Sequence, residues 1–259
     1  MNITQIVNSS KANSLLNANT NASANTSAQA TGSVSPVTQA LQKADKRIQS
    51  QLDTTTAQLS SFGKLKSAVS DAQLSARALS NFSSTASSAD VKSAANKFIS
   101  AFNAAINTAK TTASVSGGVS AESAGARSVS SDLNRTVRAS SATVDSLQQL
   151  GIKLSPDGSL TLDATKFDAA QKADPAKVKA ALAKIGELVD KTATKELATG
   201  GGVSGSMASL NQRSTALKAQ QTSLLAITQQ AATAQSSSSS SSSSSNYARF
   251  GLAAYQSGY

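Results

Sequence analysis

The sequence predicts a mainly α-helical protein, in which long terminal helices pair as an antiparallel coiled-coil leg beside a small α+β inner domain containing a β-hairpin, with disordered ends. Three observations predict this class. An apolar series with steps of three or four residues runs from Leu41 to Leu79. A weaker series lies near the other end, between Met207 and Ala231. Between the two series, short alternating runs flank a Pro-Asp-Gly turn at residues 156–158.

The two apolar series predict the leg. A helix as long as the first series, with only one apolar stripe, needs a partner to keep that stripe from water. The second series offers one, and antiparallel pairing of the two terminal segments would bury both stripes. The predicted interface consists of Leu41, Ile48, Leu52, Leu59, Phe62, Leu65 and Val69 in the first helix and Leu210, Leu217 and Leu224 in the second.

The hairpin is predicted over residues 151–163, because Pro156 presets a turn and Gly158 accepts a positive φ angle. Helices are expected on both sides of it. Asp163 can cap a short helix after the second strand, and Asp174 followed by Pro175 is typical of a helix start.

Composition divides the rest of the chain. The first residues are rich in Asn, Ser, Thr and Ala without an apolar period, so they cannot offset the entropy cost of folding. A run of serines near the other end is typical of a flexible spacer, and all three tyrosines follow it. We therefore expect a disordered arm at 1–33, a leg helix at 34–80, an inner domain at 86–200, a second leg helix at 203–235, a poly-serine linker at 236–245 and an aromatic tail at 246–259.

Missing residue types exclude most enzyme chemistry. The chain has no histidine, cysteine or tryptophan. Zinc sites, thiol nucleophiles, Ser-His-Asp catalysis and haem ligation through His or Cys are therefore excluded. With only 3% aromatic residues, the core offers few places that would shift the pKa of a carboxylate or lysine far enough for acid-base work. We expect no enzyme, no metal and no cofactor.

Charge and hydropathy limit the partners. The net charge is +10, but it is spread evenly along the chain and is not interleaved with aromatic residues. This favours a solvated basic surface over specific nucleic-acid binding. No apolar run approaches the roughly 18 residues of a membrane span, and the first residues lack the pattern of a secretory signal. We expect a soluble chain that is exported without a cleavable signal peptide.

One block of the sequence resembles a known family. Residues 147–163, LQQLGIKLSPDGSLTLD, followed by Phe167 and Asp174-Pro175, closely resemble a stretch of the flagellar filament cap protein, hook-associated protein 2. The segment FISAFN at 98–103 is similar to that family's Phe-Val-x-x-Tyr-Asn helix, with Phe102 in place of Tyr. The resemblance implies structural roles for Phe98, Phe102, Asn103, Leu150, Gly151, Ile152, Asp157, Gly158, Leu160, Leu162 and Asp163.

The resemblance implies a structural protein of the bacterial flagellum. It implies terminal helices paired as a leg, a homo-oligomer at the filament tip, contacts with flagellin or other axial proteins, and an export chaperone as a further partner. The sequence departs from the family in three ways. A short segment at 81–90 stands where the family inserts outer domains, the start is replaced by the polar arm, and poly-serine interrupts the second leg helix.

Three functional hypotheses follow. The first is a cap-like subunit that supports flagellin assembly. The second is a secreted or cytoplasmic coiled-coil interaction protein that has lost capping. The third, a non-specific nucleic-acid binder, rests on charge alone.

Overall fold

The structure is a computed structural model, and it describes residues 36–83, 85–116, 121–138 and 141–237. The chain divides into two compact units. The two-helix unit contains the described residues up to Thr54 and from Ser214 onward, and the inner unit contains residues Thr55–Arg213. The predicted arm at 1–33, the tail at 246–259 and most of the linker at 236–245 lie outside the described residues.

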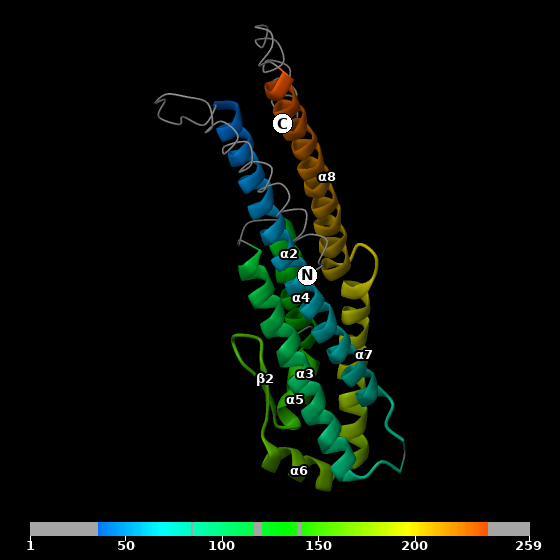
Figure 1. The fold of residues 1–259 in the computed structure, drawn as a ribbon. Helices are drawn as coiled ribbons and strands as arrows, with labels where there is room; N and C mark the ends of the chain where they lie inside the picture. Colours follow the sequence, from blue (N-terminus) through cyan, green and yellow to red (C-terminus); the bar gives the residue numbers. More distant parts are fainter. Residues whose placement is uncertain (1–35, 84, 117–120, 139–140, 238–259) are drawn as a thin grey trace. The chain divides into compact units, whose positions relative to one another are not determined.

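The two-helix unit is made by the first part of α2 (Pro36–Ser80) and the last part of α8 (Gly202–Ser237). Their apolar stripes meet in a small core of Ala44, Ile48, Leu52, Leu217 and Leu224, against which Leu41 packs. Gln49 accepts a hydrogen bond of 3.2 Å from the amide of Gln221 within the same pair. The two segments run antiparallel (Figure 1).

The inner unit is a four-helix bundle made by the remainder of α2 with α3 (Ser88–Val115), α4 (Ala121–Val137) and α7 (Pro175–Leu197). Neighbouring helices of the bundle run antiparallel (Figure 1). Side-chain contacts join them. Thr112 of α3 donates to the carbonyl oxygen of Ser61, the hydroxyls of Thr136 and Thr192 join α4 to α7 at 2.7 Å, and Arg77 of α2 pairs with Asp190 of α7 at 2.8 Å.

The segment between α4 and α7 contains the hairpin. It consists of α5 (Ser141–Gln149), β1 (Ile152–Leu154), β2 (Leu160–Leu162) and α6 (Ala164–Ala173). The strands are antiparallel, with Ile152 opposite Leu162 and Leu154 opposite Leu160. Asp163 caps α6 by accepting from the Lys166 N–H, and Asp174 caps α7 by accepting from the Lys177 N–H.

These elements confirm the predicted fold class, which is mainly helical with one small two-stranded sheet. The boundary between the two units lies within each of the two predicted leg helices. Helix α2 is continuous, but from Thr55 it packs in the inner unit, where Phe62, Leu65 and Val69 are fully buried. Helix α8 likewise contributes Val203 and Leu210 to the inner core. Helix α3 contacts α2 at Ser61, and α7 contacts its last turns through Arg77 and Ser80.

Helices α2 and α7 approach each other closely at Gly186. A Cβ atom added there would collide with the carbonyl oxygen of Ala76 and would lie 3.0 Å from the Cβ atom of Leu79. The Ser80 hydroxyl donates across the same contact to the carbonyl oxygen of Ala183, at 3.2 Å. Gly186 is therefore needed for space in the middle of a helix, where glycine is otherwise unfavourable.

Two glycine substitutions test this contact. Gly186→Ala is expected to lower the free energy of unfolding by about 1–2 kcal/mol, because overpacking outweighs the gain in helix propensity. Gly63→Ala is the matched control, because Gly63 lies in α2 with nothing within 4 Å of an added Cβ atom. It should raise stability by about 0.5–1 kcal/mol. Urea titrations followed by circular dichroism measure both, and equal effects would contradict the packing argument.

Candidate functional site

The hairpin takes its shape from two glycines with positive φ angles. Gly151 (φ 72°) precedes β1 and Gly158 (φ 90°) lies in the turn, a region that favours glycine over residues with a Cβ atom. The Asp157 carboxylate accepts from the N–H of Ser159 at 3.1 Å and from its hydroxyl at 2.8 Å. These hydrogen bonds hold the pKa of Asp157 below its usual value. The N–H of Asp163 closes the base of the hairpin by donating to the Gly151 carbonyl oxygen at 2.8 Å.

Helices α3 and α4 hold the hairpin in place. The Asn103 side chain makes two hydrogen bonds with the backbone of Leu160, accepting from its N–H at 2.7 Å and donating to its carbonyl oxygen at 2.8 Å. Asn103 therefore supplies the outer edge of β2 with the donor and the acceptor that a third strand would provide. Lys110 donates to the carbonyl oxygen of Asp157 at 2.6 Å. The Asn134 amide lies so close to Gly158 that a Cβ atom there would collide with it.

An apolar core lies beneath the hairpin. The rings of Phe98 and Phe102 are buried, with centroids 5.8 Å apart. Leu150, Ile152 and Leu160 belong to the same core, and Leu162 packs against it. The structure thus brings together in one module all the residues that the resemblance singled out, which are Phe98, Phe102, Asn103, Leu150, Gly151, Ile152, Asp157, Gly158, Leu160, Leu162 and Asp163.

The predicted coiled-coil interface falls into two groups. Leu41, Ile48, Leu52, Leu217 and Leu224 meet in the two-helix unit. Leu59, Phe62, Leu65, Val69 and Leu210 belong to the core of the inner unit. That all of them form the interface of one coiled-coil leg stays a prediction.

An acidic pair, Asp132 and the buried Glu196, joins α4, α7 and the start of α8. Glu196 is only 1% exposed, and its Oε2 atom accepts from the Gly202 N–H at 3.0 Å. Asp132 lies beside it and pairs with Lys195 at 2.7 Å. Burial raises the pKa of Glu196, and the neighbouring Asp132 carboxylate raises it further. The hydrogen bond from Lys195 holds the pKa of Asp132 below its usual value. Burial thus favours the protonated form of Glu196, and Lys195, 3.8 Å from its Oε1 atom, favours the ionised form.

This pair belongs to the scaffold. It lies where Gly125 of α4 and Gly202 of α8 approach so closely that a Cβ atom on Gly125 would lie 2.8 Å from the Gly202 carbonyl oxygen. Within the described ranges, no group of three or more acidic side chains could hold a metal ion. In the same part of the chain, no helix is long and apolar enough to cross a membrane.

Comparison with known protein families identifies the chain. The family described as flagellar hook-associated protein 2 C-terminus matches residues 76–250, which is more than half of the chain. The chain belongs to the flagellar hook-associated protein 2 family. No curated protein and no solved structure matches the chain in the corresponding comparisons.

The family is structural and not enzymatic, and it belongs to the flagellum. The match covers the whole hairpin module and the helices that hold it, from the end of α2 through α8. Sequence reasoning missed three residues of the scaffold, namely Asn134, Gly186 and Glu196. Only Gly186 left a signal, as a glycine inside a strongly helical pattern.

A substitution at Leu52 tests the two-helix unit. Leu52→Asp would place an unpaired carboxylate in a core of a few side chains, so we expect this unit to lose a few kcal/mol of stability. Thr54→Asp is the control, because Thr54 is exposed two residues away in the same helix. Hydrogen exchange resolves the two units separately. Unchanged protection of residues 36–54 and 214–237 in Leu52→Asp would show that the two helices do not stabilise each other.

Glu196 predicts a specific pH dependence. Because its folded pKa is raised, stability falls as pH rises through that value and the buried carboxylate ionises. Because the folded pKa of Asp132 is lowered, the stability from its ionised form is lost only as pH falls through that lower value. Glu196→Gln keeps both a donor for Asp132 and an acceptor for Gly202. It should therefore raise the Tm near neutral pH and have no such effect at about pH 4.

Glu187→Gln is the matched control for this experiment. Glu187 is exposed, and its pKa is lowered by Lys191, which pairs with it at 2.7 Å. Removing that charge should not stabilise the protein at any pH. A Tm for Glu196→Gln that follows the parent protein at all pH values would contradict the raised pKa of Glu196.

Proposed function

We propose that the chain is a cap-like structural subunit of the bacterial flagellum that supports flagellin assembly at the filament tip. The observation that carries the proposal is the family match over residues 76–250, within which the hairpin module is complete. In this proposal, the inner unit is a rigid body and the two-helix unit contacts flagellin, other axial proteins or further copies of the chain. An export chaperone is a further proposed partner.

The two-helix unit is suited to such contacts. Its core is small, and a polar Gln49–Gln221 contact lies within its seam. A pair of helices that buries so little apolar surface gains from further helices packed against it. Axial flagellar proteins with helical ends would supply these helices. In this way the two-helix unit would take part in filament assembly.

One observation favours an alternative. Helices α2 and α3 are joined by residues 81–87, and α3 begins at once with a capping box formed by Ser87 and Asp90. This short connection leaves no room for an inserted outer domain. A coiled-coil interaction protein of the same family that has lost capping, secreted or cytoplasmic, agrees with this connection. Non-specific nucleic-acid binding has no support beyond the charge.

A secretion experiment decides between these alternatives. The full chain is expressed in strains with and without the flagellar export apparatus, and the medium is assayed for the protein. We expect secretion only where the apparatus is present. Protein that stays in the cytoplasm of both strains would overturn the cap-like proposal and favour the cytoplasmic interaction protein.

Two deletions sharpen the test. Removing residues 2–33, which are rich in Asn, Ser, Thr and Ala and have no sustained apolar period, should abolish secretion and leave the inner unit folded. Removing residues 246–259, which contain Tyr247, Phe250 and Tyr255, should leave secretion intact and weaken assembly, because these rings are suited to contact with another subunit. Circular dichroism of both variants checks that the helices remain.

A further inference from the structure

The turn between α7 and α8 is compact and rich in glycine. Gly200 has a positive φ angle of 84°, and a Cβ atom added to Gly201 would collide with the carbonyl oxygen of Glu196. The Ser204 hydroxyl donates back to the carbonyl oxygen of Leu197 at 2.7 Å. The first turn of α8 therefore lies directly against the last turn of α7.

The carboxyl group of Glu196 closes this turn from within. Its Oε2 atom accepts from the N–H of Gly202, the first residue of α8. The N–H groups of a first helical turn have no partner inside their own helix, so a side-chain acceptor is needed where water is excluded. The buried Glu196 thus provides for α8 what a capping residue provides at an exposed helix start.

Helix α4 packs against the same turn. A Cβ atom on Gly202 would lie 2.8 Å from the carbonyl oxygen of Gly125 and 3.3 Å from a methyl group of Val129. Asp132 follows one turn later in α4 and lies beside Glu196. The turn, its carboxyl group and α4 therefore form one contact that has no space for a larger side chain.

The charged groups that act on Glu196 come from α4 and from α7 itself. Asp132 of α4 opposes its ionisation, and Lys195 of α7, whose Nζ atom lies 3.8 Å from Oε1, favours it. Lys195 is shared, because its Nζ atom also pairs with Asp132 at 2.7 Å. Arg135 of α4 acts through Asp132, from which it lies 3.9 Å.

Neither α8 nor α2 adds a charge that acts on Glu196. Helix α8 has no ionisable side chain before Arg213, which lies about 17 Å along the helix from its start. Helix α2 contacts this end of α7 through the uncharged Gln73, which donates to Thr194 at 2.7 Å. The ionisation of Glu196 thus depends on its burial, on Asp132 and on Lys195.

We propose that Glu196 is a pH-sensitive latch, which holds the α7–α8 turn on α4 while its carboxyl group is protonated and releases the turn when the group ionises. The neutral group lies beside the ionised Asp132 without repulsion. Ionisation sends the proton to the solvent and leaves two carboxylates side by side, with Lys195 shared between them. Because this is unfavourable where water is excluded, the turn moves away from α4 until water reaches Glu196.

The order of ionisation sets the direction of the latch. The hydrogen bond from Lys195 lowers the pKa of Asp132, so this carboxyl group is charged first as pH rises. Burial and the charge on Asp132 raise the pKa of Glu196, so it is charged second. The contact is therefore intact below the raised pKa and is lost as pH rises through it. Acid unfolding has the opposite direction.

Release of the latch concerns only one corner of the inner unit. The hairpin is held from α3, where Asn103 makes two hydrogen bonds with the backbone of Leu160, so the hairpin stays in place. All residues of the latch belong to the inner unit. The latch therefore does not depend on the proposed role in capping.

Hydrogen exchange of the full chain, followed by NMR from about pH 5 to about pH 9, tests the latch. Protection factors are compared, because they correct for the intrinsic effect of pH on exchange. We expect the protection of the Gly202 and Gly205 amides to fall about tenfold as Glu196 ionises. The protection of the Leu160 amide should stay constant.

Two substitutions separate a latch from a merely structural role. Glu196→Gln keeps an acceptor for Gly202 but cannot ionise, so the protection of Gly202 should no longer depend on pH. Asp132→Asn removes the charge that opposes ionisation, so the pH midpoint of the Gly202 amide chemical shift should move to a lower value. A role in packing alone would not move this midpoint.

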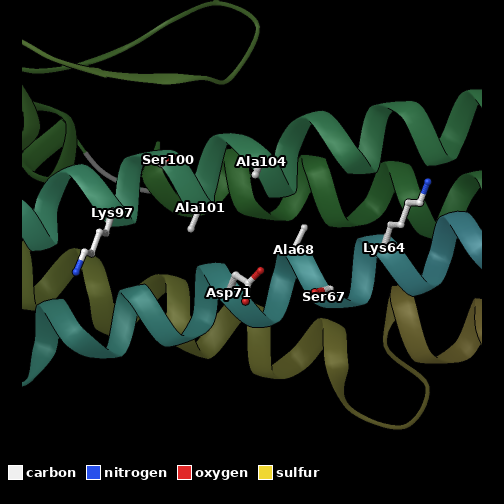
Figure 2. A pocket seen from close by; sticks show the side chains of 8 residues that line it. All are labelled: Lys64, Ser67, Ala68, Asp71, Lys97, Ser100, Ala101 and Ala104. Atoms are coloured by element: carbon white, nitrogen blue, oxygen red, sulfur yellow. The ribbon is translucent and has the colours of Figure 1, made fainter.

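Asp71→Asn is the matched control. Asp71 is an exposed carboxylate of the same unit, and it lies in an open groove between α2 and α3, with Lys64 and Lys97 at opposite ends (Figure 2). Removing its charge should change neither the midpoint nor the protection of Gly202, because water already screens this charge.

Each outcome bears on the proposal. Constant or rising protection of Gly202 in the parent protein overturns it. An equal fall in Glu196→Gln also overturns it, and so does an equal fall at Leu160, which would show that the whole unit unfolds. Failure of secretion in the flagellar strains would leave the latch unaffected, so the two proposals fail separately.

Discussion

Helix α2 has one strongly apolar stripe that runs its whole length, and burying this stripe organises the rest of the protein. No single partner covers it. Up to Thr54 it packs against the end of α8, and from Thr55 it packs within the four-helix bundle. Because few residues are aromatic, the bundle relies on close approach of backbones instead of bulky side chains. Gly186 against Ala76 and Gly125 against Gly202 are two places where backbones approach this closely.

The hairpin module is held by backbone hydrogen bonds as much as by apolar burial. A two-stranded sheet is marginal by itself, because its outer backbone groups lack partners. Asn103 supplies one donor and one acceptor to Leu160, and Lys110 supplies a donor to the turn. Phe98 and Phe102 lie on the same helix as Asn103 and cover the apolar face of the strands. The family match includes this module, in which α3 supplies both the hydrogen bonds and the apolar contacts to the hairpin.

The surface of the inner unit carries its charges in different environments. Several lysine and arginine side chains of the described residues form ion pairs with carboxylates, as Arg77 and Lys195 do. Lys64, Asp71 and Lys97 do not, and they surround a groove of small residues. Glu196 represents the opposite case, a carboxyl group whose burial favours its protonated form. The buried Glu196 is thus held by internal contacts, whereas these three charged side chains remain exposed.

The helical class, the hairpin with its caps and the family could all be predicted from the amino-acid sequence. These features depend on local patterns: an apolar period, a Pro-Asp-Gly turn, and Asp before a helix. The tertiary structure decided which partner each part of α2 meets. The stripe from Leu41 to Leu79 has the same period throughout, so its period could not show that Leu52 and Phe62 belong to different units. The tertiary structure also decided the pairing of Asp132 with Glu196 and the place of Asn134 above Gly158, because these residues are far apart in the chain and only the packing of α4 brings them together.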